Sequence, residues 1–382
     1  MKHCFFLLSS FLVLSFANAK TRTVCNYPNK AGQDSTIQAA IGKSSNGDTI
    51  LVQGSPVEYA GFTINNIRLT IIGPGWWPLR QMVPTLALTA KVKTSFINGA
   101  SASGTELQGL HFVASGTESL VISNTASIND IRLIRNHFSN KVLIGTNGTG
   151  LSYSGYVVEG NWFDNNTKLI ADKDCDYHNF MIQNNIFNGT RIAYFSNLAN
   201  TNILINHNVF FNRTFFYPFL NDFMEPGTYS QYLTIQNNIF YNSDLTYSRY
   251  DSTCQCNYLS LGNSVLKNNI TYNSSTTAPW TTNGNVNGSG NLNNTNPNVT
   301  DAGAILNGNN DPSLNFVIQN GPAKNTATDG KDMGLLFDTQ GSLNWTNSRM
   351  SRIPYIYNFS ISNPNIAPGG SVQITIDARR NN

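Results

Sequence analysis

The stretch FMIQNNIFNG, residues 180–189, decides the fold of this 382-residue chain. Asn185 stands between Ile182, three positions before it, and Phe187, two positions after it. Apolar and polar residues alternate over a run this short in half-buried β-strands. Asn and Gly close the run, and both residue types favour turns. The stretch therefore predicts short strands that meet at a turn held by Asn185.

The same pattern recurs at spacings of 25, 24, 23, 30 and 31 residues. The aligned asparagines are Asn136, Asn161, Asn185, Asn208, Asn238 and Asn269. A helical solenoid would need a period of 3.6 over ten or more residues, which these runs lack. A repeat of this length instead predicts an all-β, right-handed parallel β-helix, in which coils of three short strands stack at about 4.8 Å.

Alternation within each strand separates inward from outward positions. Inward columns are predicted three residues before and two residues after each asparagine; the second is a phenylalanine in five coils. The position two residues before the asparagine is mostly polar, as in Glu159 and Gln183, and is expected to face solvent. The stacked asparagines are expected to form a ladder in which each amide bonds its neighbour and the backbone.

The N-terminus reads as a secretory signal peptide over residues 1–19, because an apolar run ends in the small residues Ala17-Asn18-Ala19. Export to the extracellular space or the cell surface follows, and no later segment is apolar for the about 20 residues that a membrane helix needs. Only 12% of residues are charged, with a net charge of +3 and no basic cluster. This composition argues against nucleic acid and suits a polysaccharide or cell-surface glycan.

The repeat resembles the pectin-lyase-like right-handed β-helix proteins, including polysaccharide lyases. The sequence from Ser35 to Gly75 is similar to the first coils of that group, with a capping helix at 37–41. NGPAKNTATDGKDMG, residues 320–334, is similar to a closing segment, and both pieces are expected to cap the solenoid. The predicted β-helix spans 20–349, and residues 350–382 are expected to add a short β-hairpin tail.

Three insertions between coils are expected to leave the solenoid after the same strand and to form one loop-bearing side: 166–179, 213–231 and 243–263. Loops on a rigid scaffold often carry function. Their aromatic residues are candidates for stacking on sugar rings or for simply covering the solenoid. The substrate-binding candidates are Phe216, Tyr217, Tyr247 and Tyr250.

The resemblance to polysaccharide lyases implies chemistry for two of these loops. Such enzymes remove the proton alpha to a uronic acid carboxylate with Lys or Arg as the base, often with Ca²⁺ neutralising the carboxylate. Lys173 and Arg249 are the candidate bases. The candidate Ca²⁺ ligands are Asp172, Asp174 and Asp176, although alternate aspartates also occur in solvated loops.

Other features count against a familiar catalytic centre. Neither the R-x-P-x-x-R arrangement of pectate lyases nor the motif set of polygalacturonases occurs. His111, His137 and His207 lack a neighbouring nucleophile and are interpreted as ordinary turn or surface residues.

Four cysteines outside the signal peptide, Cys25, Cys175, Cys254 and Cys256, can pair in three ways, and one disulfide that ties two long loops together is expected. A metal site at Cys254, Cys256 and His178 is the weaker alternative, because C-x-C lacks the spacing of zinc sites. The sequence favours an exported, carbohydrate-directed protein that binds an acidic polysaccharide and leaves open whether it cleaves it. The alternative is a non-catalytic surface or adhesion protein.

Overall fold

The computed structural model describes most of the chain after the predicted signal peptide. The described residues are 19–28, 32–76, 88–113, 115–122, 125–145, 150–164, 168–171, 175–189, 191–193, 201–211, 230–243, 245, 248–251, 256–259, 261–275, 279–306, 314–336, 355–361 and 369–379. Nearly all of the predicted signal peptide lies outside them.

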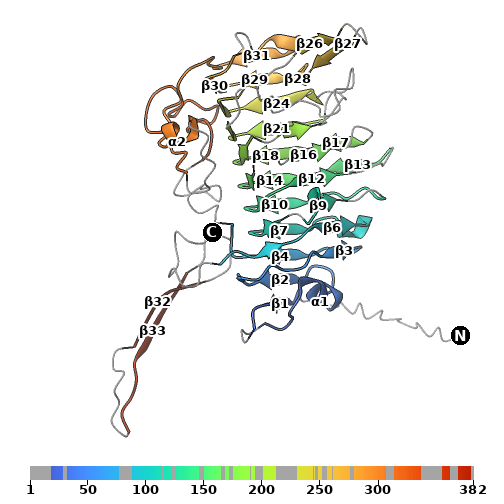
Figure 1. The fold of residues 1–382 in the computed structure, drawn as a ribbon, viewed down its shortest axis with the longest axis vertical. Coiled ribbons are helices and arrows are strands. Elements are labelled where there is room, and N and C mark those ends of the chain that lie inside the picture. Colours follow the sequence, from blue (N-terminus) through green and yellow to red (C-terminus); the bar gives the residue numbers. More distant parts are fainter. Residues whose placement is uncertain are drawn as a thin grey trace, which may run out of the picture.

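The chain is a right-handed parallel β-helix of pectin-lyase-like architecture (Figure 1). Three long parallel sheets form its walls within the described residues, and each coil from β4 to β20 adds one strand to each sheet. Sheet A contains β1 (Thr21–Val24), β2 (Thr49–Val52), β4 (Thr70–Ile72), β7 (Glu106–Gln108), β10 (Arg132–Ile134), β14 (Val157–Glu159), β18 (Phe180–Gln183), β21 (Ile203–Asn206), β24 (Leu233–Gln236), β29 (Val265–Lys267) and β31 (Val286–Ser289).

The other two walls follow in each coil. Sheet B contains β5 (Lys91–Val92), β8 (His111–Phe112), β11 (His137–Phe138), β15 (Trp162–Phe163), β19 (Ile186–Asn188), β22 (Val209–Phe211), β25 (Ile239–Tyr241) and β30 (Ile270–Tyr272). Sheet C contains β3 (Thr63–Asn65), β6 (Ser95–Asn98), β9 (Glu118–Ile122), β12 (Lys141–Ile144), β16 (Lys168–Ala171) and β20 (Arg191–Ala193).

The inward phenylalanines form one continuous stack behind sheet B. Phe138 lies 5.2 Å from Phe112 and 5.1 Å from Phe163 between ring centroids, and the planes are nearly parallel. The stack continues through Phe187 and Phe210 to Phe240 at 4.6–4.9 Å. All these rings are fully buried, so the register predicted from the sequence is the register of the core.

The asparagine column runs along the corner between sheets A and B. Asn161 N donates to Asn185 Oδ1 at 2.9 Å, and Asn161 Nδ2 donates to Leu133 O in the coil below at 2.8 Å. Equivalent bonds join each member to the next, and Asn291 extends the column by one coil. Each buried amide thus satisfies a backbone N–H and a carbonyl that the turn would leave unpaired.

The corner residue before each column asparagine has a positive φ. Glycine or asparagine holds this position in most coils, for example Gly160 (φ 67°) and Asn184 (φ 55°), because both tolerate the left-handed region. Arg135 and His207 occupy it as well. The neighbouring outward positions are less exposed than the alternation predicts, since Gln183 is only 8% exposed and Glu159 is half-buried.

A short helix closes the N-terminal end, as the sequence predicts. Helix α1 (Ile37–Gly42) starts at Thr36, whose side chain accepts a hydrogen bond from Ala39 N at 3.1 Å. Its buried face, which includes Ile37 and Ile41, packs against β1 and β2. The helix therefore covers the open end of the core.

The segment 314–336 lies along the outer face of sheet B and does not cap the end of the solenoid as expected. Its apolar residues, among them Phe316 and Ile318, pack on the outer side chains of β19, β22, β25 and β30. Corner residues of several coils bind its backbone or hydroxyls: Leu336 N donates to Asn184 Oδ1, Gly334 O contacts His207 Nδ1, and Asn237 Nδ2 donates to Thr328 Oγ1, at 2.8–3.0 Å. We call this segment the cover.

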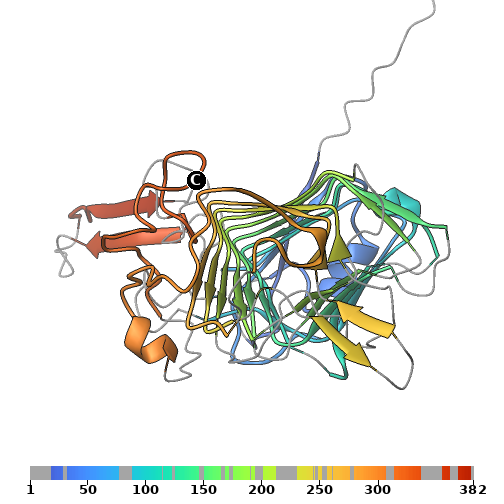
Figure 2. The same cartoon turned by 90° about the horizontal axis from the view of Figure 1, so that it is seen from above.

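Smaller elements project on the other side of the solenoid. Strands β13 (Ser152–Ser154) and β17 (Asp176–His178) pair in parallel, as do β23 (Ser230–Gln231) and β28 (Leu261–Gly262). The antiparallel pair β26 (Ser248–Asp251) and β27 (Cys256–Leu259) extends away from the sheets, opposite the cover (Figure 2). All of these strands except β13 fall within the predicted insertions, but the first insertion, 166–179, also contains the sheet C strand β16 and is therefore not wholly a loop.

The C-terminal residues form the predicted hairpin, in which β32 (Tyr355–Ile361) pairs antiparallel with β33 (Ile374–Arg379). The hairpin projects away from the solenoid (Figure 1). The remaining helices are α2 (Ala302–Leu306), η3 (Ala100–Ala102) and η4 (Thr282–Gly284). No helix in the described ranges has the length and apolarity that a bilayer crossing requires.

Candidate functional site

The outer face of sheet B changes from ionisable to apolar along the solenoid. Because Phe112, Phe138 and Phe163 point inward, the residue before each of them points outward. The outward column, in stacking order, is Lys91, His111, His137, Trp162, Ile186, Val209, Ile239 and Ile270. The apolar part lies under the cover, and the ionisable part lies on the coils before it.

Asp164 and Ser139, three residues after the column asparagines of their coils, complete a hydrogen-bonded cluster with the histidines. Asp164 Oδ2 lies 2.8 Å from His137 Nε2 and accepts from Ser139 Oγ at 2.9 Å. Trp162 Nε1 donates to Asp164 Oδ1 at 2.8 Å. His111 Nε2 lies 3.0 Å from Ser139 Oγ. We call Lys91, His111, His137, Ser139 and Asp164 the sheet B site.

The hydrogen bonds fix which nitrogen of His137 carries a proton. Opposing effects act on Asp164: burial raises its pKa, but bonds from His137, Trp162 and Ser139 outweigh burial and lower the pKa below its ordinary value. An ionised carboxylate only accepts, so His137 Nε2 is the protonated, donating nitrogen. Nδ1 then holds the lone pair, and the described residues provide no hydrogen bond to it.

The same bonds argue against a serine nucleophile. The single proton of the Ser139 hydroxyl goes to Asp164, so His111 Nε2 must donate to Ser139 Oγ and cannot accept its proton. A nucleophilic serine would require the opposite arrangement, with histidine as the base. Ser139 therefore orients Asp164 and His111.

His111 is a neutral neighbour of His137. Burial, followed by the nearby His137 ring, lowers the pKa of His111 to about 2. The two rings stack with centroids 3.9 Å apart and planes 9° apart. Protonation of both rings at once is unfavourable, because two cationic rings in contact would repel each other.

The two rings do not fit a single metal ion in this arrangement. The ligand atoms of His111, His137 and Asp164 all lie within 4.8 Å of one another, which is close enough for a metal cluster by distance alone. However, an ion about 2.0–2.1 Å from both Nε2 atoms would sit between the two stacked rings. It would then lie outside both ring planes, whereas the lone pair of an imidazole nitrogen points along its ring plane. The cluster is better suited to proton transfer than to metal binding.

Two buried tryptophans lie beside His137. Trp76 approaches the His137 ring edge-on, with ring centroids 6.1 Å apart. It also contacts Trp162 at a tilted angle, with centroids 5.6 Å apart, and both indoles are buried. The His137 side chain is 8% exposed and the Asp164 side chain is 31% exposed. Lys91 is largely open to solvent. A polar ligand can thus meet Lys91 and Asp164 directly, with His137 at the base of the site.

The histidines were interpreted from the sequence as ordinary turn or surface residues, and that interpretation is wrong for His137, which lies in strand β11 and is 6% exposed. His207 does occupy a turn position, but it is buried there, at 1% exposed. The signal was present in the repeat: His111 and His137 share one aligned position, and Ser139 and Asp164 share another. Aligned positions in successive coils lie in contact, so the four side chains had to meet.

The structure places only part of the site predicted on the loops. Asp176 is exposed at the start of β17, and Arg249 and Tyr250 lie in β26 opposite Tyr258 and Asn257. The strands carrying Asp176 and Arg249 belong to different strand pairs. The other candidates lie outside the described residues: Asp172, Lys173, Asp174, Phe216, Tyr217 and Tyr247.

The structure tests the predicted disulfides only in part, because it describes three of the four cysteines. Cys25 and Cys175 are both buried, and no disulfide joins them to each other. Cys254 lies outside the described residues, and Cys256 begins β27. The proposed metal site at Cys254, Cys256 and His178 therefore stays a prediction.

Comparison with known proteins gives likenesses of fold alone. No family model and no curated protein matches the sequence. A PL6-family alginate lyase mutant is similar over 67% of this chain and 38% of its own, at 14% identity and a TM-score of 0.29. Two pectin methylesterase complexes with hexasaccharides match 71% of this chain and 94% of theirs, at 10% and 11% identity and TM-scores of 0.27 and 0.25. The matched part of this chain thus spans about two fifths of the alginate lyase.

Proposed function

We propose that this chain is an exported, carbohydrate-directed protein that binds an acidic polysaccharide and cleaves it by elimination at the sheet B site. The observation that carries the proposal is the His137–Asp164 contact of 2.8 Å, which leaves a lone pair on His137 Nδ1. The exposed Lys91 lies in the same outward column, two coils away on the far side of His111. Removal of a proton alpha to a carboxylate requires a base and a cation that one sugar unit can reach.

Each group has a separate task in this proposal. Lys91 pairs with the uronate carboxylate and stabilises the negative charge that builds up as the alpha proton leaves. His137 Nδ1 takes that proton, and Asp164 stabilises the resulting imidazolium. The ring carbon in the beta position then loses its bond to the bridging oxygen, and a double bond forms between the alpha and beta carbons. The leaving oxygen takes a proton from solvent.

Neutral His111 supports the same step. Its pKa of about 2 keeps it uncharged over the whole physiological range, so it does not oppose the charge that forms on His137. Ser139 holds both His111 and Asp164 through its single hydroxyl. These two residues position the base, and neither needs to touch the sugar.

The loop-bearing side is the second placement for the same activity. There Lys173 or Arg249 would be the base, and Ca²⁺ on Asp172, Asp174 and Asp176 would neutralise the carboxylate. The aromatic residues Phe216, Tyr217, Tyr247 and Tyr250 would bind sugar rings. The exposed position of Asp176 and the projecting β26–β27 pair favour access to that side.

Appearance of unsaturated uronate absorbance on a panel of acidic polysaccharides tests the proposal. We expect His137→Gln and Asp164→Asn to abolish product formation with the fold intact by circular dichroism, while Lys173→Ala and Arg249→Ala retain it. The reverse pattern would move the activity to the loop-bearing side. No product with any polysaccharide would contradict elimination, and retained binding would then support a non-catalytic adhesion protein.

A further inference from the structure

Trp162 lies at the boundary between the ionisable and the apolar part of the outward column of sheet B. It follows His137 in stacking order and precedes Ile186. The side chain is fully buried, so no ligand can contact it. The indole nevertheless reaches the sheet B site, because Trp162 Nε1 donates to Asp164 Oδ1 at 2.8 Å. The proposed elimination does not itself use this bond.

The indole fixes the orientation of the Asp164 carboxylate. Asp164 Oδ2 faces His137 and Ser139, whereas Asp164 Oδ1 accepts from Trp162. Donors on both oxygens hold the carboxylate against rotation about its Cβ–Cγ bond. Hydrogen bonds to an ionised carboxylate are roughly twice as strong as bonds between neutral groups. Loss of the indole donor would therefore free the carboxylate to turn away from His137.

Aromatic rings on two sides hold the indole in place. The Trp76 ring lies 5.6 Å from the Trp162 ring between centroids. Phe211, two coils further along the stack, meets Trp162 edge-to-face at 6.0 Å. All three side chains are buried. Side chains packed this closely keep one rotamer, so the position of the Trp162 N–H is fixed by its neighbours.

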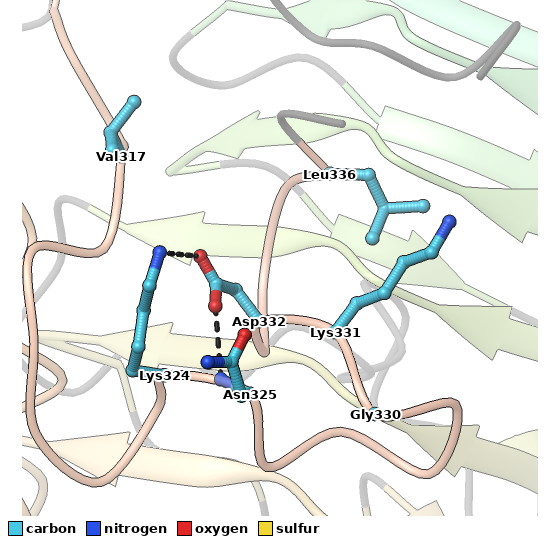
Figure 3. A pocket seen from close by; sticks show the side chains of 7 residues that line it. All are labelled: Val317, Lys324, Asn325, Gly330, Lys331, Asp332 and Leu336. Carbon is cyan, nitrogen blue, oxygen red and sulfur yellow. Dashed lines mark hydrogen bonds and ion pairs between the residues drawn. The ribbon is translucent and has the colours of Figure 1, made fainter. Parts of the chain in front are cut away.

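The packing around Trp162 continues into the cover. Phe316 of the cover meets Phe211 edge-to-face at 5.2 Å, and Phe316 is buried. The cover is also closed on itself, because Asp332 accepts from Lys324 Nζ and from Asn325 N, each at 2.9 Å (Figure 3). These two bonds join the early and the late part of the cover. Phe316 therefore belongs to a segment that is fixed both to sheet B and to itself.

We infer that Trp162 is a positioning residue that holds Asp164 in line with His137, and that the cover keeps Trp162 in place through Phe316 and Phe211. Contiguous packed side chains are a physical route for such coupling. The inference rests on the proposed function only for the reaction that this geometry serves. The geometry itself is a property of the free protein. The cover thus has a second role besides sealing the apolar part of sheet B.

Carbon-13 NMR of the Asp164 carboxyl group, in a pH titration of the full chain, tests the positioning role. Burial raises the pKa of Asp164, and hydrogen bonds to the ionised form, including that from Trp162, outweigh burial. We expect Trp162→Phe to move the Asp164 titration to higher pH, because one donor to the ionised form is lost. Trp280→Phe removes another buried indole and is the matched control, which should leave the titration unchanged.

Kinetics add a second measurement if the wild-type protein cleaves a polysaccharide. Trp162→Phe should lower kcat about tenfold, which corresponds to the loss of one hydrogen bond to a charged group. KM should stay the same, because the buried indole does not touch the sugar. A higher KM with unchanged kcat would contradict the positioning role.

A second pair of variants tests the support from the cover. Phe316→Leu removes the aromatic ring of the cover, so it should move the Asp164 titration in the same direction as Trp162→Phe but by less. Thr328→Val, which loses the hydrogen bond from Asn237 to another part of the cover, should not move it. In the Trp162→Phe background, Phe316→Leu should add nothing, because coupling through Trp162 disappears with the indole.

The outcomes separate the positioning role from the proposed activity. An Asp164 titration that is the same in Trp162→Phe and in the wild type overturns the positioning role, even if the wild type cleaves a polysaccharide. Equal effects of Phe316→Leu and Thr328→Val overturn the aromatic support, and this comparison decides alone if Trp162→Phe does not fold. If the titrations shift as expected while no polysaccharide is cleaved, the positioning role holds and elimination fails.

Discussion

The outer column of sheet B has two parts that share one backbone register but differ in chemistry. The cover does not reach the coils of Lys91, His111 and His137. It packs on the four apolar residues of the later coils, which are Ile186, Val209, Ile239 and Ile270. The inner column behind both parts is nearly the same stack of phenylalanines. The β-helix backbone therefore fixes where each outward side chain lies. The type of that side chain decides whether the coil is covered or presents ionisable groups.

The largest effect is expected from placing an ionisable residue in the sealed part. Ile239→Asp would bury a carboxylate against the cover, where Ile239 is fully buried, and should lower the free energy of unfolding by about 5 kcal/mol. Urea unfolding followed by circular dichroism measures it. Lys267→Asp on exposed β29 is the control; a loss below about 1 kcal/mol for Ile239→Asp would show that the cover is loose.

The inner stack should respond alike in both parts. Phe138 lies behind the sheet B site and Phe210 lies behind the cover, and each is stacked between two other rings. Replacing either by alanine should cost about 3–5 kcal/mol of unfolding free energy by the same urea titration. A much smaller cost for Phe138→Ala than for Phe210→Ala would mean that the two parts differ inside as well as outside.

Each part contains a histidine–aspartate contact, and the two contacts should differ in strength. Asp164 accepts three hydrogen bonds and is 31% exposed, whereas Asp329 contacts His207 at 3.2 Å and is 43% exposed. Asp164→Asn should lower the unfolding free energy by about 1–3 kcal/mol. Asp329→Asn, the matched variant, should lower it by less; equal losses would contradict the special role of Asp164.

The neutral histidine predicts a pH dependence of stability. The folded-state pKa of His111 is lowered from 6.5 to about 2 by burial and by His137, with Asp164 acting in the opposite direction and Lys91 in the same one. Its stabilising contribution is therefore complete above pH 6.5 and is lost as the pH falls toward 2, because the unfolded chain binds the proton first.

Unfolding titrations at several pH values measure this slope, which is at most about 1.4 kcal/mol per pH unit from His111. The pKa of His207 is also lowered by burial, so the covered part contributes in the same direction. His111→Asn should flatten the wild-type curve just below pH 6.5. An unchanged curve would show that His111 titrates in the folded protein as it does in the unfolded chain.

The smallest effect is expected at an exposed ion pair on sheet A. Arg132 Nε lies 3.1 Å from Glu106 Oε2, and 42% of the Arg132 side chain is exposed. Arg132→Ala should change the unfolding free energy by about 0.5 kcal/mol or less, because solvent screens such pairs. A larger loss would indicate that stability on the outer surface does not follow burial.

The repeat predicts the solenoid because its information is local and periodic. Asn185, Ile182 and Phe187 define an inward register that the neighbouring coils repeat. The position of the cover follows no period, since its bonds join residues far apart in the sequence, as Asn184 and Leu336 do. A pattern based on one coil cannot show which outward face a distant segment will seal.

The sheet B site was missed for the same reason. His111 and His137 occupy outward positions, which alternation assigns to solvent. The burial of His137 depends on Trp76, which precedes it in the chain by more than a coil, and on the His111 ring of the neighbouring coil. By contrast, the loop candidates were found from the insertions between coils and from the resemblance to polysaccharide lyases, and most of them fall outside the described residues.

Histidine-selective NMR during titration with an acidic oligosaccharide tests the central claim most directly. His111 and His137 lie in the open part of the outward column, and His207 lies beneath the cover as an internal reference. The account predicts that the ring resonances of His111 and His137 shift with added ligand while those of His207 do not. Shifts confined to residues of the loop-bearing side, with His137 unmoved, would contradict it.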